Sequence, residues 1–151
     1  MIANSREKLI CEALDAARAQ GIKIWPGAAF DWTDRPAGIT FRRFEVPGPS
    51  GPLPSACNVL GALELIVGRT KDSGYEGFYE KAAKYLGVGT FWLHRLHIGF
   101  DLGVQFFFTV KDKKGKVVRD KSGNPVEKPD EVSKLGMKLR KKYIGKISCT
   151  Q

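Results

Sequence analysis

A cysteine, a histidine and an aspartate form the first group of residues whose chemistry could be catalytic. We expect Cys57 at the start of a helix, where the helix dipole lowers a thiol pKa and favours the nucleophilic thiolate. His97 and Asp101 are four residues apart, so on one helix they would share a face as a base and its orienting carboxylate. The alternative is a core cysteine beside a local structural hydrogen bond, and the sequence favours this alternative over a thiol enzyme.

The segment Ala82–Leu96 carries a second pattern, which resembles the helix-turn-helix motif of DNA-binding proteins. Ala83 allows two helices to approach closely, and Gly87 forms the turn between them. The side chains that would face DNA bases are those of Thr90, His94 and Arg95. Phe91 and Trp92 are apolar where base reading requires polar groups. Because the same packing pattern describes any tight helical hairpin, a purely structural hairpin stays open as the alternative.

Basic residues are concentrated at the end of the chain, which has a formal net charge of +9. Residues 1–110 contain 12 Lys/Arg and 11 Asp/Glu, whereas residues 111–151 contain 13 Lys/Arg and 5 Asp/Glu. Such a lopsided distribution attracts polyanions, although a solvated surface is the simpler interpretation. The residues that we expect to contact an anionic partner are Lys111, Lys113, Lys114, Lys116, Lys121, Lys138, Arg140, Lys141 and Lys142.

The elements that must position these residues are predicted from hydrophobic periodicity and capping residues. Helices are expected over residues 5–20, 56–67, 75–85, from 90 onward and over 130–143, with Asn4, Ser55 and Asp130 as N-caps. Strands are expected over residues 22–25, 38–46 and 104–111, with turns at 113–116 and 121–125 and a return strand beginning at Val117. We find no internal repeat. The prediction is a single α+β domain over residues 1–151, with about five helices, a small antiparallel sheet and a basic β-hairpin extension over 104–125.

Composition excludes several functional classes. No apolar run is long enough to span a bilayer, and the first residues lack the apolar core of a signal peptide, so we expect a cytoplasmic protein with no membrane partner. Cys11, Cys57 and Cys149 have no paired spacing, and the chain has only two histidines. The sequence therefore predicts no metal site and no cofactor.

Three sequence blocks carry a resemblance to known proteins. They are Cys57–Leu63, the stretch from Leu86 through Trp92 to the run His97–Asp101, and Leu135–Tyr143. In these blocks the chain resembles small uncharacterised proteins of bacteriophage and prophage genomes. The resemblance covers roughly half of the chain. It implies a mobile-element origin and a shared architecture around Trp92–Asp101, and it supplies no activity.

The functional expectation is stoichiometric binding of an anionic partner rather than catalysis. That partner would be nucleic acid or an acidic protein surface, such as a host nucleoprotein complex in the host cytoplasm, with antagonism of host defence as one form. A nucleotide- or small-molecule-binding protein is an alternative, with the segment Pro47–Pro54 as a lid. Its pocket would be lined by Trp25, Phe30, Trp32 and Phe41. The thiol enzyme of Cys57, His97 and Asp101 is the remaining alternative.

Overall fold

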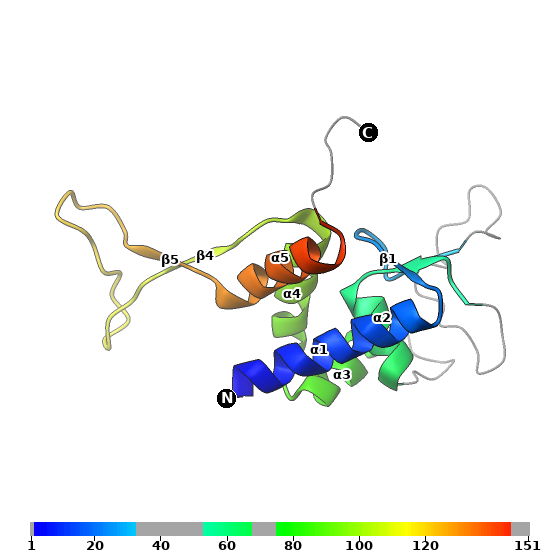
Figure 1. Cartoon of the computed structure of the whole chain (residues 1–151). Coiled ribbons are helices and arrows are strands. Elements are labelled where there is room, and N and C mark those ends of the chain that lie inside the picture. Colours follow the sequence, from blue (N-terminus) through cyan, green and yellow to red (C-terminus); the bar gives the residue numbers. More distant parts are fainter. Residues whose placement is uncertain (1, 33–52, 68–74, 146–151) are drawn as a thin grey trace.

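The computed structural model describes residues 2–32, 53–67 and 75–145 (Figure 1). These residues form five helices and two small sheets, which confirms the predicted α+β class. The helices are α1 (Ile2–Ala19), α2 (Val59–Val67), α3 (Tyr75–Leu86), α4 (Thr90–Leu102) and α5 (Glu131–Tyr143). The predicted strand at 38–46, Phe41, Cys149 and residues 47–52 of the proline-rich segment lie outside the described residues.

The core lies where α1, α2, α3 and α4 pack against one another. The apolar stripe of α1 that faces this core is the predicted one. Four of its residues are fully buried: Ile10, Ala13, Leu14 and Ala17. Gly21 ends that helix with a φ of 84°, a conformation that glycine adopts without steric cost. The start of α1 differs from prediction, because the helix begins at Ile2 and Asn4 lies within it rather than at its cap.

A three-stranded sheet covers one end of the helical body. It consists of β1 (Lys23–Ile24), β2 (Phe30–Asp31) and β3 (Ala56–Cys57), with β3 in the centre, parallel to β1 and antiparallel to β2. The prediction that a helix begins at residue 56 with Ser55 as its cap was therefore wrong. Asn58 caps α2 instead, because its Oδ1 accepts a hydrogen bond from the backbone N–H of Gly61 at 2.9 Å.

Helices α4 and α5 cross with their backbones in contact. A Cβ atom at Gly99 would overlap the carbonyl oxygen of Ser133, and one at Gly136 would overlap the carbonyl oxygen of Leu96. The crossing therefore depends on glycine on both sides. Arg140 on α5 also donates hydrogen bonds of 2.7 Å to the carbonyl oxygens of Phe100 and Asp101, which satisfies the end of α4.

Residues 107–129 form a basic arm that leaves the helical body between α4 and α5 (Figure 1). Its stem is the antiparallel pair β4 (Phe107–Thr109) and β5 (Glu127–Pro129), with Phe107 opposite Pro129. Beyond the stem the arm splits into two tips, each closed by an isolated bridge, Lys111 to Val117 and Arg119 to Pro125. The structure thus differs from the predicted single hairpin, in which the strand beginning at Val117 would have paired with 104–111.

Three valines join the stem to the two tips. The backbone N–H of Val118 donates to Val110, that of Val126 donates to Val118, and that of Val110 donates to Val126, at 2.8–2.9 Å. These three hydrogen bonds form a closed ring. The junction therefore links the two tips to each other and to the stem.

The two tips are copies of one turn, which corrects the expectation that the chain has no internal repeat. In the first tip Oδ1 of Asp112 accepts from the backbone N–H groups of Lys114 and Lys116; in the second, Asp120 accepts from Ser122 and Asn124. All four distances are 2.8–3.0 Å. The fourth residue of each turn is a glycine with φ near 82°, Gly115 and Gly123. The repeat unit is thus an eight-residue segment that begins at Val110 and again at Val118.

Candidate nucleic-acid interface

The basic arm exposes all of its cations to solvent. They are Lys111, Lys113, Lys114, Lys116, Arg119, Lys121 and Lys128. None of them forms an ion pair within the described ranges. The arm contains three acidic residues, Asp112, Asp120 and Glu127, so it carries an excess of positive charge.

The two aspartates of the tips form no ion pair with a lysine of the described residues. Each uses Oδ1 to accept two backbone N–H groups of its own turn. A carboxylate held in this way fixes the turn and points its oxygen at the backbone. The Lys113, Lys114, Lys116 and Lys121 side chains therefore remain available as point charges at the ends of the arm.

The predicted cations of α5 are placed differently from those of the arm. Lys138 forms a 2.8 Å ion pair with Glu7 of α1, and Arg140 is committed to the end of α4. Lys141 and Lys142 are exposed, and Lys142 Nζ lies 3.7 Å from the Cys11 sulfur. Because α5 runs from the root of the arm back across the helical body, its last turn is far from the tips (Figure 1). The structure thus brings the arm lysines together and leaves the last-turn cations of α5 apart from them.

The α3–α4 hairpin is tightly packed, as either a helix-turn-helix motif or a purely structural hairpin would be. Ala83, Leu86, Leu93 and Leu96 are buried, and Gly87 has a φ of 70° at the turn. Of the proposed base-reading residues, Thr90 is exposed at the first position of α4 and His94 is partly buried. Burial and, secondarily, the neighbouring His97 lower the pKa of His94, which favours its neutral form.

Arg95, the third of these residues, is already engaged within the protein. Its Nη1 lies 2.6 Å from Oδ1 of Asp130, a carboxylate that is only 2% exposed. The guanidinium carbon also lies 5.1 Å from the ring centre of Phe91 and 5.4 Å from that of Phe108. Arg95 therefore joins α4 to the root of the arm and is not free to reach into a DNA groove.

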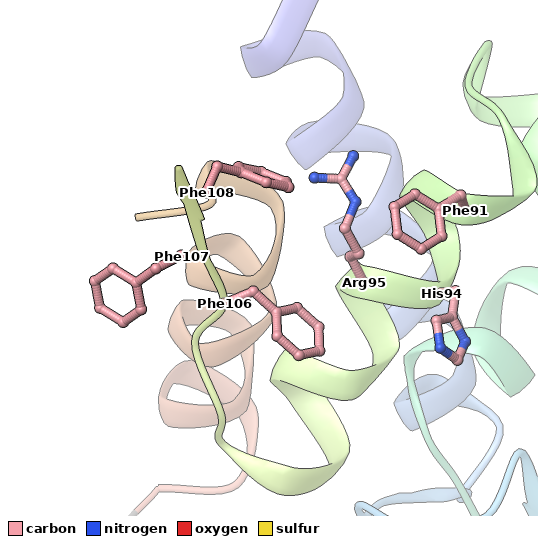
Figure 2. Close-up of a pocket in the computed structure, with 6 residues that line it drawn as sticks. All are labelled: Phe91, His94, Arg95, Phe106, Phe107 and Phe108. Atoms are coloured by element: carbon pink, nitrogen blue, oxygen red, sulfur yellow. The ribbon is translucent and has the colours of Figure 1, made fainter. Parts of the chain in front are cut away.

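An aromatic cleft opens at this root, between α4 and the first strand of the arm (Figure 2). Its volume is about 290 Å³, and it is lined by Phe91, His94, Arg95, Phe106, Phe107 and Phe108. The rings of Phe106 and Phe108 point from the strand toward α4, whereas the Phe107 ring points to the other side. Phe91 is 65% exposed and Phe108 is 40% exposed, so both rings present apolar surface to solvent.

Sequence reasoning missed this aromatic cleft. In the helix-turn-helix interpretation, Phe91 is only a poor base-reading residue. In the strand prediction, Phe106–Phe108 are only β-forming residues. The available signal was the run of three phenylalanines immediately before the lysine-rich segment. Aromatic residues next to basic ones are typical of surfaces that bind single-stranded nucleic acid.

The candidate thiol group does not show the nucleophilic chemistry of the thiol-enzyme alternative. Cys57 lies in β3 and is 1% exposed, and burial raises its thiol pKa to about 12. The expected lowering of that pKa was wrong, because the residue lies in a sheet ahead of α2 rather than on the first turn of the helix. At neutral pH the thiol is protonated and is a poor nucleophile.

His97 and Asp101 do form the predicted contact, with Nδ1 and Oδ2 separated by 3.1 Å. The other ring nitrogen of His97 lies 2.9 Å from the hydroxyl of Tyr79, and Asn58 donates to both oxygens of Asp101. Both histidine nitrogens are thus occupied. The group forms a polar network that connects α3, α4 and the cap of α2.

The residues expected to line a small-molecule pocket lie in different environments. Phe30 and Trp32 are buried core residues, Trp25 is exposed beside Lys23, and Phe41 lies outside the described ranges. Among the residues that the structure describes, no group of three or more His, Cys, Asp or Glu side chains is arranged to hold a metal ion. None of the described helices is both long and apolar enough to cross a membrane.

Comparison with known proteins assigns no relative to this chain. No family model matches it, and no significant match occurs among curated proteins or solved structures.

Proposed function

We propose that this protein binds nucleic acid through its basic arm. The observation that carries the proposal is the set of seven exposed cations on residues 107–129, none of them paired with a carboxylate of the described residues. Nucleic acids carry a regular row of phosphate charges, and each phosphate that a lysine or arginine neutralises releases condensed counterions. Unpaired cations on a projecting arm suit this kind of partner.

The composition of the tips favours nucleic acid over an acidic protein surface. Protein–protein interfaces are enriched in aromatic residues at their centres and depleted in lysine. The two tips have the opposite composition, with four lysines and no aromatic side chain between Asp112 and Asn124. Lysine ammonium groups act as point charges that contact phosphates without reading sequence. The proposed binding by the tips is therefore independent of base sequence.

Neutralising three lysines of the tips tests this proposal. In the variant Lys113→Gln, Lys114→Gln, Lys121→Gln, we expect the affinity for DNA at low salt to fall by about tenfold or more. The slope of log affinity against log salt should become less steep by about 2–3, because up to three phosphate contacts are lost. Fluorescence anisotropy of a labelled duplex over a salt series measures both quantities.

The matched control removes the same charge from the helical body. Lys8, Lys23 and Lys84 are exposed and lie outside the arm, so the variant Lys8→Gln, Lys23→Gln, Lys84→Gln has the same net charge as the first. We expect it to bind DNA within about twofold of the unmodified protein. Equal losses in the two variants would show that total charge rather than the arm determines binding.

A further inference from the structure

We infer that the aromatic cleft accepts an unpaired base, so that the basic arm and the cleft together select single-stranded nucleic acid. This inference rests on the proposed function, because the cations of the arm supply the attraction that brings a strand to the cleft. It specifies the class of ligand, single-stranded nucleic acid, and the residues that would distinguish it from a duplex.

The geometry of the aromatic cleft suits a flat, aromatic group. Phe91 and Phe108 extend from opposite walls, one from α4 and one from β4, and Arg95 lies between them (Figure 2). Bases stack on aromatic rings and on the planar guanidinium of arginine regardless of their identity, since every base has a π face. Arg95 already contacts one side of each ring, so the ring surfaces of Phe91 and Phe108 that stay exposed, 65% and 40%, are the candidate stacking partners.

The walls of the cleft are held in place before any ligand binds. Asp130, the residue that follows the arm, pairs with Arg95 and donates its backbone N–H to the carbonyl of Phe106 at 2.7 Å. The backbone N–H of Phe106 donates in turn to the hydroxyl of Ser133 at 2.9 Å. A prearranged site loses less conformational entropy on binding, so these contacts favour tight stacking of a single base.

Size and position favour an unpaired base over a duplex. A volume of about 290 Å³ is at the lower limit of small-molecule pockets, so the cleft suits one small planar group. In a duplex, bases are paired and stacked on their neighbours, so none is available to enter without a cost of several kcal/mol. The aromatic cleft also adjoins the stem of the arm, so a strand whose phosphates follow the lysines would carry its bases past it.

The test compares three probes of equal length, about 12 nucleotides, within the site-size range of small single-strand binders. They are an oligothymidine strand, a strand of abasic sites with the same phosphates, and a DNA duplex. We expect the unmodified protein to bind oligothymidine about tenfold more tightly than the abasic strand. Equal binding of these two strands would overturn the inference and leave the proposed function standing. Binding to none of the three would contradict the proposed function itself.

The variant Phe91→Leu, Phe108→Leu assigns the stacking to the cleft. Leucine keeps apolar bulk at two exposed positions, so the fold is retained, which a melting curve checks. We expect the preference for oligothymidine over the abasic strand to disappear, with duplex affinity unchanged within about twofold. The control Trp25→Leu changes an exposed aromatic residue beside Lys23, and we expect it to keep the preference. A full preference in the double variant would show that bases stack elsewhere and would overturn the inference.

Discussion

Replacing Gly99 with alanine is expected to lower the free energy of unfolding by about 3 kcal/mol, the upper part of the usual range for overpacking. The added Cβ would overlap the carbonyl oxygen of Ser133, which belongs to the backbone of α5 and cannot rotate away. The two helices would have to separate along their whole crossing. For a chain of this size, that loss corresponds to a melting temperature lower by roughly 10 °C.

Two further glycine variants make this prediction specific. Gly136→Ala places a Cβ against the carbonyl oxygen of Leu96 on the other side of the same crossing, so we expect a similar loss. Gly89, just before α4, has a φ of −83°, and no atom lies within 4 Å of the position that a Cβ would occupy there. Gly89→Ala should therefore change stability by less than about 1 kcal/mol. Melting curves of all three variants provide the comparison, and near-equal melting temperatures would contradict the close crossing of α4 and α5.

Replacing Asp130 with alanine is expected to cost about 3–4 kcal/mol of stability. Asp130 is 2% exposed and has two roles: it pairs with Arg95, and it caps α5 by accepting from the backbone N–H groups of Val132 and Ser133. Removing one partner of a buried ion pair leaves the other charge without compensation, and losing an N-cap adds about 1 kcal/mol. Chemical denaturation of the variant measures the loss.

Two further substitutions, one at Asp130 and one at the next residue, separate these roles. Asp130→Asn keeps an N-capping side chain but removes the negative charge, so we expect it to cost about 2 kcal/mol, less than alanine. Glu131→Gln removes a negative charge at the next, exposed position and should cost less than about 0.5 kcal/mol. If Asp130→Ala proved as mild as Glu131→Gln, the proposed attachment of the arm through Arg95 and Asp130 would be wrong.

Features that depend on residues close in sequence could be predicted. The N-cap of α5 at Asp130 and the buried residues Leu139 and Tyr143 follow from a capping residue and a 3.6-residue period, and both are present. The turn at Gly87 and the contact between His97 and Asp101 are likewise local. The capping contacts of Asp130 and the contact between His97 and Asp101 join atoms separated by no more than about a turn of helix.

Features that depend on distant residues could not be predicted in the same way. Ala56 and Cys57 lie at the start of an apolar run that suits a helix, but pairing with β1 and β2 makes them a strand and moves the cap to Asn58. That pairing also buries the Cys57 thiol and raises its pKa rather than lowering it. The helical period of the following residues gave no sign of the distant partner strands.

The architecture of the arm and of the aromatic cleft also depends on distant residues and could not be predicted from sequence. The spacing of Asp112 to Gly115 and of Asp120 to Gly123 was visible in the sequence, but the ring of hydrogen bonds among Val110, Val118 and Val126 is a three-dimensional property. Arg95, which lines the cleft, and Asp130, which holds Arg95 in place, are 35 residues apart. The bacteriophage origin and the antagonism of host defence stay predictions from sequence.

The most direct test of nucleic-acid binding by the arm is to remove the two tips and keep the stem. Replacing residues 111–125 with Asn-Gly joins Val110 to Val126, whose backbones are already hydrogen-bonded at 2.8 Å, through a turn that suits two-residue hairpins. Duplex DNA affinity of this variant and of the full chain would be measured by anisotropy over the same salt series, with melting curves to verify folding. We predict that the variant folds. It should show no salt-dependent duplex binding at protein concentrations at which the full chain saturates the labelled duplex. A folded variant that bound duplex DNA with the affinity and salt slope of the full chain would contradict the account.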